Sequence, residues 1–385
     1  MPHAIQHPHP RHLLIVFARI SNTRACLKGR PPSMRIANAC RATSTPKAAS
    51  SSSPRFSTLT LRVAPLPCVI DRQISSRRHC TVHTSISTTP FATRHIQHRH
   101  LATTPQKQHT MSDKLIPSNP ADVMVIRHVT PNVVTFSVPF SRFGTMKIGG
   151  RGTLVKMTSG DLAVFSPVAL TEEAKAKVAE LGGNVAYIVA LDFEHHIFLS
   201  EWLKAYPTAK LVGPEGLPEK RAKQNDPKIG SEPFATVFTK DKKSTTRIGD
   251  DFDRDFDYEY VDGHANKEIV VNFRPDRTLI EADLFFNLPA TEQYSRVPED
   301  QKQANGFLAR HFEGLQNPQS GNNKWMKRFN WFVLAKDRAS FNESIRAIAK
   351  WDFVNLIPCH GDVLEGNAKE VFQKTFEWHI EGKHH

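Results

Sequence analysis

The sequence predicts an α/β protein in which helices pack against β-sheets. From about Val123 onward, short β-rich runs alternate with amphipathic segments, and the strands fall into two groups separated by a polar stretch. The roughly 275 residues after position 110 are enough to bury a sizeable core in one domain.

The first strand group and its helices follow from turn and cap signals. Residues 153–157 and 162–166 flank Thr158-Ser-Gly-Asp161 and are expected to pair as a hairpin. A helix is expected from Thr171, an N-cap residue followed by two acids, to the pair Gly182-Gly183. The other expected elements are strands at 123–128, 133–138, 185–191 and 210–213 and a helix at 197–205.

The second group follows a polar region, residues 214–251, with one short apolar run at 234–238. A long loop with a little helix is expected over 287–325, and such loops are often functional. The expected elements are strands at 256–261, 268–273, 278–282 and 354–358 and helices at 326–335, 340–350 and 367–380.

The basic charge of the chain belongs to its first part. The formal net charge is +13, but residues 1–110 hold 16 of the 51 Lys and Arg and only one of the 38 acids. The remainder is close to neutral, so the charge gives no reason to expect nucleic acid as a partner of the folded domain. No apolar run approaches the roughly 20 residues that a membrane span needs, so no membrane partner is expected either.

Residues 1–110 are expected to form a disordered basic leader, and the domain is expected over 112–385. The leader is rich in Arg, Ser, Thr, His and Pro and cannot bury enough apolar surface to fold. Two interpretations stay open: a mitochondrial transit peptide, or an upstream extension ahead of a natural start at Met111. Only Cys359 lies beyond the leader, so a reducing compartment is expected, cytoplasmic or, if the leader is genuine, mitochondrial.

Candidate site residues gather where strands end. His195 and His196 follow the expected strand 185–191, and His264 follows the expected strand 256–261. Asp283 is the last residue of the apolar run 279–283, and His360 follows the segment Ile357-Pro-Cys359. Loops converge at strand ends, and imidazole and carboxylate groups are common ligands of zinc. Taken singly, each residue is more simply a hydrogen-bonded histidine or a turn-forming aspartate. Their order along the chain is what favours a metal site.

That order resembles the metallo-β-lactamase superfamily, and within it the branch named domain of unknown function 4336 (DUF4336), over about Val123 to Trp378. The resemblance implies a four-layered αβ/βα sandwich. The segments that carry it are GGRGTLVKMTSGDLAVFSPVAL (149–170), EHHIFLSEWLKAYPTAKLVGP (194–214), DGHANKEIVV (262–271), RTLIEADLFFNLP (277–289) and IPCHGDVLEGN (357–367).

The superfamily signature is His-x-His-x-Asp-His, followed by a separate His, a bridging Asp and a final His. The helix start HIFLSEWL places the last signature His at His196 and the Asp position at His195, while Leu191 and Phe193 stand where the first two histidines belong. The later positions correspond to His264, Asp283 and His360. One metal site of a binuclear member therefore lacks most of its ligands here.

The other site keeps four capable ligands, so the resemblance implies one divalent ion, zinc above manganese or iron. His195, His196 and His360 are expected as ligands, Asp283 as ligand or general base, and His264 as a supporting residue or weak fifth ligand. The expected function is metal-dependent hydrolysis of a small-molecule ester, thioester or phosphoester. The alternative is a non-catalytic descendant whose cleft binds a small molecule or a partner.

Overall fold

The computed structural model describes residues 119–302, 306–319 and 323–385. The predicted leader, residues 1–110, lies outside the described residues. Within the described ranges, no helix is long and apolar enough to cross a membrane.

The larger sheet has seven strands in the order β1-β2-β5-β6-β7-β8-β9. Its first four strands pair antiparallel, including the predicted hairpin, and β6 through β9 run parallel. The bounds are β1 Val125–Thr130, β2 Val133–Val138, β5 Gly150–Lys156, β6 Leu162–Phe165, β7 Val185–Val189, β8 Lys210–Pro214 and β9 Thr236–Phe238.

Two helices, α3 (Glu172–Leu181) and α4 (Leu199–Ala205), cover the outer face of this sheet. The predicted cap of α3 is confirmed, since Thr171 Oγ1 accepts the Ala174 N–H at 3.2 Å. In α4, the fully buried Trp202 packs near Phe136 of β2 and donates from Nε1 to the Val168 carbonyl at 2.7 Å. This anchoring fixes the start of α4, which directly follows the His195-His196 pair.

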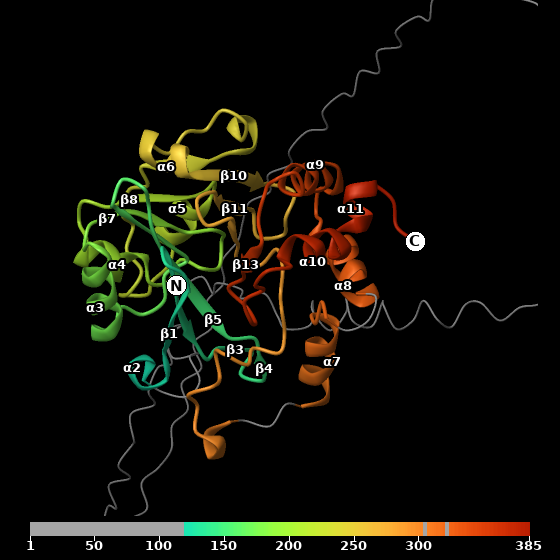
Figure 1. Ribbon diagram of the computed structural model, residues 1–385, viewed down its shortest axis with the longest axis horizontal. Helices are drawn as coiled ribbons and strands as arrows, with labels where there is room; N and C mark the ends of the chain where they lie inside the picture. The colour runs from blue at the N-terminus through green and yellow to red at the C-terminus, as the bar shows by residue number, and fades with distance from the viewer. Residues whose placement is uncertain (1–118, 303–305, 320–322) are drawn as a thin grey trace, which may run out of the picture. The chain divides into compact units, whose positions relative to one another are not determined.

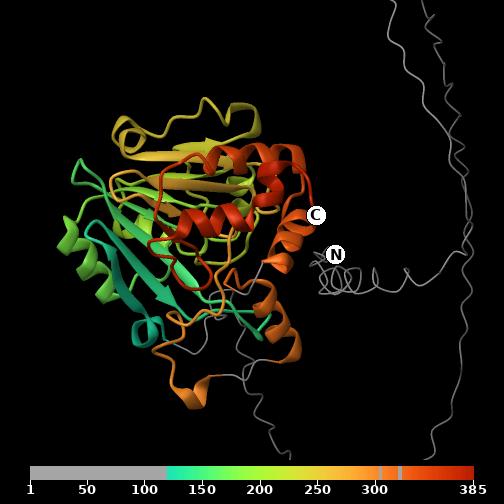
Figure 2. The ribbon, with the colours of Figure 1, turned by 45° about the vertical axis from the view of Figure 1, so that its right-hand side comes forward.

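The smaller sheet has four strands in the order β10-β11-β12-β13. Its strands are β10 Phe256–Val261, β11 Glu268–Phe273, β12 Thr278–Ile280 and β13 Asn355–Ile357. Three C-terminal helices pack on its outer face and lie in front of it in Figure 2: α9 Arg338–Ile348, α10 Ala368–Thr375 and α11 Glu377–Glu381.

The two sheets face each other across an apolar core, which is continuous from Val155, Phe165 and Val189 on the larger sheet to Tyr260, Val271 and Ile280 on the smaller one. A second core lies under α3 and α4, and a third under α9 to α11. The order of layers is therefore helix, sheet, sheet, helix (Figure 1). The four-layered αβ/βα sandwich predicted from the sequence is confirmed.

Several short elements were not predicted. The polar region 214–251 holds α5, η2 and the start of α6 as well as β9, whereas the little helix expected in the loop 287–325 is present as η3 and α7. The predicted helix 326–335 is present, but its second half is a π-helix, labelled η4. The remaining elements of the fold, predicted or not, are α2 Pro120–Val123, β3 Ser141–Arg142, β4 Met146–Lys147, α5 Leu217–Ala222, η2 Lys240–Lys242, α6 Asp250–Asp255, η3 Glu299–Gln301, α7 Phe307–Leu315, α8 Lys324–Phe329 and η4 Asn330–Leu334.

His379 of α11 gives the fold a measurable dependence on pH. Its ring is 1% exposed and contacts Asn342 Oδ1 at 2.7 Å. Burial and then the charges of Arg338 and Arg346 lower its pKa to about 3. Between about pH 6.5, the ordinary pKa of histidine, and about pH 3, the His379 ring binds a proton in the unfolded chain but stays neutral in the folded chain. The free energy of unfolding therefore falls as the pH falls towards 3.

Replacing His379 by Gln removes the titratable ring and supplies a side-chain amide that can still donate to Asn342. Between pH 7 and pH 5 the free energy of unfolding of wild type is expected to fall by about 2 kcal/mol more than that of His379→Gln. Urea unfolding of both proteins at the two pH values measures the difference. Parallel losses in the two proteins would show that His379 is charged in the folded state.

Candidate metal centre

Three side chains from distant parts of the chain meet at one edge of the sheets. His195 lies between β7 and α4, Asp283 follows β12, and His360 follows β13. Among the described residues these are the three His, Cys, Asp or Glu side chains that could hold a metal ion together, with one ligand atom from each lying within 4.8 Å of the others. His195 Nε2 lies 3.2 Å from His360 Nε2, which in turn lies 3.1 Å from Asp283 Oδ1.

The partners of the two Nδ1 atoms determine which nitrogen of each ring is free. His195 Nδ1 lies 2.8 Å from the buried Asp192 carboxylate, and His360 Nδ1 lies 2.7 Å from the Gly149 carbonyl oxygen. Both partners accept hydrogen bonds, so each Nδ1 carries the proton and donates it. A neutral ring of this tautomer presents a lone pair at Nε2. Histidines that bind metal typically donate their other N–H in this way.

The residues around this group set the direction of each side chain. Asp192 Oδ1 also accepts the backbone N–H groups of Glu194 and His195, at 2.9 and 2.8 Å, which turns the chain sharply after β7. Asp283 Oδ2 accepts from Asn266 Nδ2 at 2.5 Å, while Oδ1 faces His360. The backbone of Asp283 is fixed by Glu268, whose carboxylate accepts the N–H groups of Ala282 and Asp283.

The structure does not bring His196 into the group. Its Nδ1 lies 3.4 Å from Arg221 Nη1, which can only donate, so this nitrogen accepts and its lone pair is engaged. Arg221 also donates to the His196 carbonyl at 2.7 Å. Burial, followed by the charges of Lys220 and Arg221, lowers the pKa of His196 to about 3. Its side chain therefore supports the start of α4 rather than facing the other two imidazoles.

His264 is also outside the group. The Asn266 N–H donates to His264 Nδ1 at 3.2 Å, and the ring stacks on Phe341 of α9 with centroids 6.1 Å apart. Burial lowers the pKa of His264 to about 4, although Asp283 and Asp192 act in the opposite direction. It keeps a supporting position beside the Asn266 turn, and that turn holds Asp283.

The charges of the three residues depend on one another. Burial lowers the pKa of His195, but Asp192, Asp283 and Glu268 outweigh it and raise that pKa to about 9. Burial lowers the pKa of His360, against the influence of Asp283. Burial would raise the pKa of Asp283, yet its contact with His360 and the charge of His195 lower it well below the usual range. Asp283 is therefore a weak base that stays ionised, which suits a metal ligand better than a general base.

The positions of the first two signature histidines offer no donor. Leu191 is fully buried in the core between the sheets. The Phe193 ring packs beneath the ammonium groups of Lys220 and Lys267, with Nζ atoms 5.5 and 5.8 Å from its centroid. Neither Leu191 nor Phe193, which the resemblance places at these positions, can coordinate a metal ion.

The four-layered αβ/βα sandwich is also the fold of solved metallo-beta-lactamases. Residues 143–315 match a family model described as Domain of unknown function (DUF4336). The resemblance to this family that the motifs predicted is confirmed over these residues. No curated protein sequence matches the chain.

Solved structures with a similar arrangement share little sequence with this chain. A metallo-beta-lactamase from Pontibacter korlensis is 14% identical with a TM-score of 0.42, covering 66% of this chain and 98% of its own. The flavodiiron core of Flv1 from Synechocystis is 12% identical with a TM-score of 0.45, covering 67% and 61%. The mono-zinc form of FIM-1 from Pseudomonas aeruginosa is 13% identical with a TM-score of 0.42, covering 70% and 98%.

Sequence reasoning missed the residues that position these three side chains. Asp192 precedes His195 by three residues, a spacing typical of an Asx turn, and this signal could have identified it. Arg151 pairs with Glu292 and donates to the carbonyls of Pro358 and Gly361 on either side of His360, while Asn266 donates to Asp283. These residues had no comparable local signal, because their partners are 17 or more residues away in the sequence.

Proposed function

We propose that His195, Asp283 and His360 bind one divalent metal ion. The observation that carries the proposal is the approach of two imidazole Nε2 atoms to 3.2 Å when both Nδ1 atoms already donate to fixed acceptors. Two lone pairs at this separation need a proton or a cation between them. The carboxylate of Asp283, with Oδ1 lacking a well-aligned hydrogen bond, adds a third donor and a negative charge.

The donor set fits such an ion. Two imidazole nitrogens and one carboxylate oxygen suit zinc, and also manganese or iron, and three protein ligands leave a position open as in catalytic sites. A divalent ion held here would supply Lewis-acid activation of water and of the bond under attack. The chain itself contributes the orientation of both rings, through Asp192 and the Gly149 carbonyl, and the fixed carboxylate of Asp283.

A pocket of about 320 Å³ opens directly beside these histidines. His195 and His360 are among its lining residues, and its volume is that of a small-molecule site. We propose that this pocket holds the substrate of a metal-dependent hydrolase, with an ester, thioester or phosphoester bond placed at the histidines.

A non-catalytic binding protein is the second candidate. The observation that favours it is the replacement of the first two signature histidines by Leu191 and Phe193, both packed into apolar or cation-π contacts. A fold that has lost one metal site can keep the pocket for binding alone.

Hydrolysis of model substrates separates the two candidates. The full-length protein, loaded with zinc, manganese or iron, is tested with 4-nitrophenyl acetate and bis(4-nitrophenyl) phosphate before and after chelation. A hydrolase gives turnover that is lost with the chelator, returns with the metal, and is absent in His360→Ala. Stoichiometric metal without turnover of either ester would favour the binding protein instead.

A further inference from the structure

One cation that lines the pocket, Arg142, forms no ion pair within the part of the chain that the structure describes. The charged lining residues besides His195 are Arg142, Arg151 and Glu194. Arg151 is neutralised by Glu292 at 3.3 Å, and Glu194 is paired with Lys220 at 3.2 Å. Over residues 119–302, 306–319 and 323–385, no carboxylate lies within ion-pair distance of the half-buried Arg142, although its charge helps to lower the pKa of Asp283.

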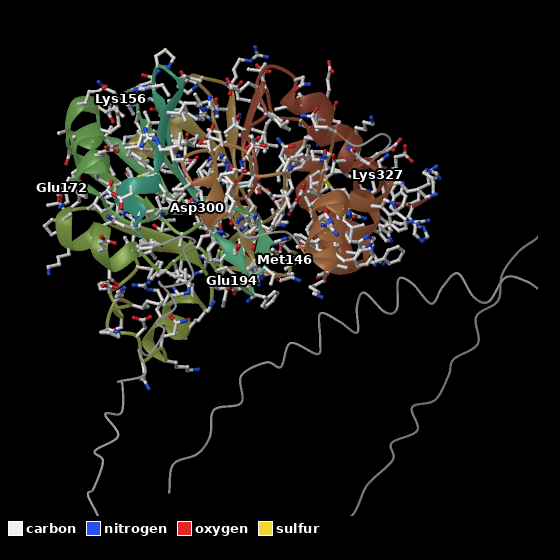
Figure 3. All side chains as sticks on the ribbon, turned by 90° about the horizontal axis from the view of Figure 1, so that it is seen from below. Met146, Lys156, Glu172, Glu194, Asp300 and Lys327 are labelled. Atoms are coloured by element: carbon white, nitrogen blue, oxygen red, sulfur yellow. The ribbon has the colours of Figure 1, made fainter. Side chains whose placement is uncertain are left out.

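Arg142 is held at the pocket by a short hairpin. β3 and β4 pair with Arg142 opposite Met146 and Ser141 opposite Lys147, so Arg142 and Lys147 belong to different rungs. The turn residues Phe143 and Gly144 have φ of 53° and 72°, as a type I′ turn requires. A positive φ is strained for a residue as large as Phe143. The Phe143 side chain lines the pocket and is 61% exposed, and the Arg142 guanidinium lies 5.6 Å from the centroid of its ring. In Figure 3, which shows the molecule from below, Met146 of this hairpin and Glu194 of the pocket wall are both labelled.

The remaining wall of the pocket is apolar. Its larger side chains come from the end of β2, from the segment between β6 and α3 and from the segment leading into α4, and they include Val138, Phe140, Val168, Ile197 and Phe198. An apolar wall with one unneutralised guanidinium selects for a ligand with an apolar body and one anionic group, since a planar guanidinium binds a carboxylate or phosphate through two parallel hydrogen bonds.

We propose that the substrate of this pocket is a small amphipathic anion, with an apolar body against Phe140 and Phe198 and a carboxylate or phosphate group bound by Arg142. The inference rests on the proposed function in one respect: the bond that is hydrolysed would lie at His195 and His360. The recognition of the anion by Arg142 needs no metal ion.

Binding of three probes with the same chain tests the proposal. Octanoate, octyl phosphate and octanol are titrated calorimetrically into the full-length protein, as purified and after removal of metal by EDTA. We expect at least one anion to bind about tenfold or more tightly than octanol in both preparations. The anion that binds more tightly shows whether Arg142 recognises a carboxylate or a phosphate group.

Variants on the hairpin supply matched controls. Arg142→Gln is expected to abolish the preference for the anion, and Arg142→Lys to keep part of it, because an ammonium supplies the charge without the fork. Lys147→Gln removes the same charge from the same hairpin at a residue that does not line the pocket, and should leave the preference intact. Thermal unfolding of the variants verifies that each remains folded.

Three results would overturn the inference: octanol binding as tightly as the anions, an unchanged preference in Arg142→Gln, or no binding of any probe. None of these depends on metal, so they are distinct from failure of the metal site. A protein that binds metal but shows no preference for anions contradicts the inference alone.

Discussion

His360→Ala is expected to weaken zinc binding by more than about 100-fold. Losing a partner that merely orients a ligand already costs about 10- to 100-fold in metal affinity, and this variant removes a ligand itself. It leaves His195 Nε2 and Asp283 Oδ1 without the imidazole that lies 3.2 and 3.1 Å away. Competition with a zinc-binding dye, monitored through the first equivalent of metal, measures the affinity.

Controls are needed because the chain is rich in histidine, and ten of its 19 histidines precede residue 111. His128→Ala removes a surface imidazole that is 41% exposed and far in sequence from the three ligands, and its affinity should match that of wild type. Equal loss in His128→Ala and His360→Ala would show that zinc binds non-specifically to the chain's histidines.

Arg151→Met is expected to destabilise the fold by about 3–5 kcal/mol, because it leaves two buried carbonyl groups without their donor and removes a buried charge that pairs with Glu292. Arg151 is 1% exposed and spans the larger sheet and the His360 turn. Its Nη1 donates to the carbonyls of Pro358 and Gly361 at 2.6 and 2.7 Å, and its Nε donates to Ser137 Oγ at 2.9 Å. Burial lowers the pKa of Arg151, and Glu292 opposes this.

Urea unfolding measures the effect, with Lys175→Met as the control. Lys175 pairs with Glu172 on the exposed face of α3, so its loss should leave the free energy of unfolding close to that of wild type. Since Arg151 holds the carbonyls on both sides of His360, the variant should also bind zinc more weakly under conditions where it is folded. Stability equal to that of wild type would show that the His360 turn is held by other contacts.

The sequence was sufficient for the elements with strong local signals. Turn residues and apolar runs predicted the β5–β6 hairpin, and a cap and closing glycines predicted α3. The β3–β4 hairpin was missed because two-residue strands carry no periodicity, yet it positions Arg142. The π-helix of η4 was expected to be ordinary helix, since its wider turn leaves no signature in the residues.

The adjacent histidines show where sequence reasoning about the site reached its limit. The order of motifs predicted that His195, Asp283 and His360 would lie close together, and one ligand atom of each lies within 4.8 Å of the others. It could not distinguish His195 from His196 as facing that group, because the difference depends on hydrogen-bond partners. Asp192 accepts from one Nδ1, whereas Arg221, from α5, donates towards the other. The second partner is 25 residues away, in a helix that was not predicted.

X-ray absorption at the zinc edge tests the central claim most directly. The full-length protein is loaded with less than one equivalent of zinc, so that the tightest site fills first, and is then desalted. The proposed centre predicts retained zinc with two imidazole nitrogens at about 2.0–2.1 Å, oxygen ligands including a carboxylate, and no sulfur. Loss of all zinc on desalting, or a shell of three or four imidazoles, would contradict a centre built from His195, Asp283 and His360.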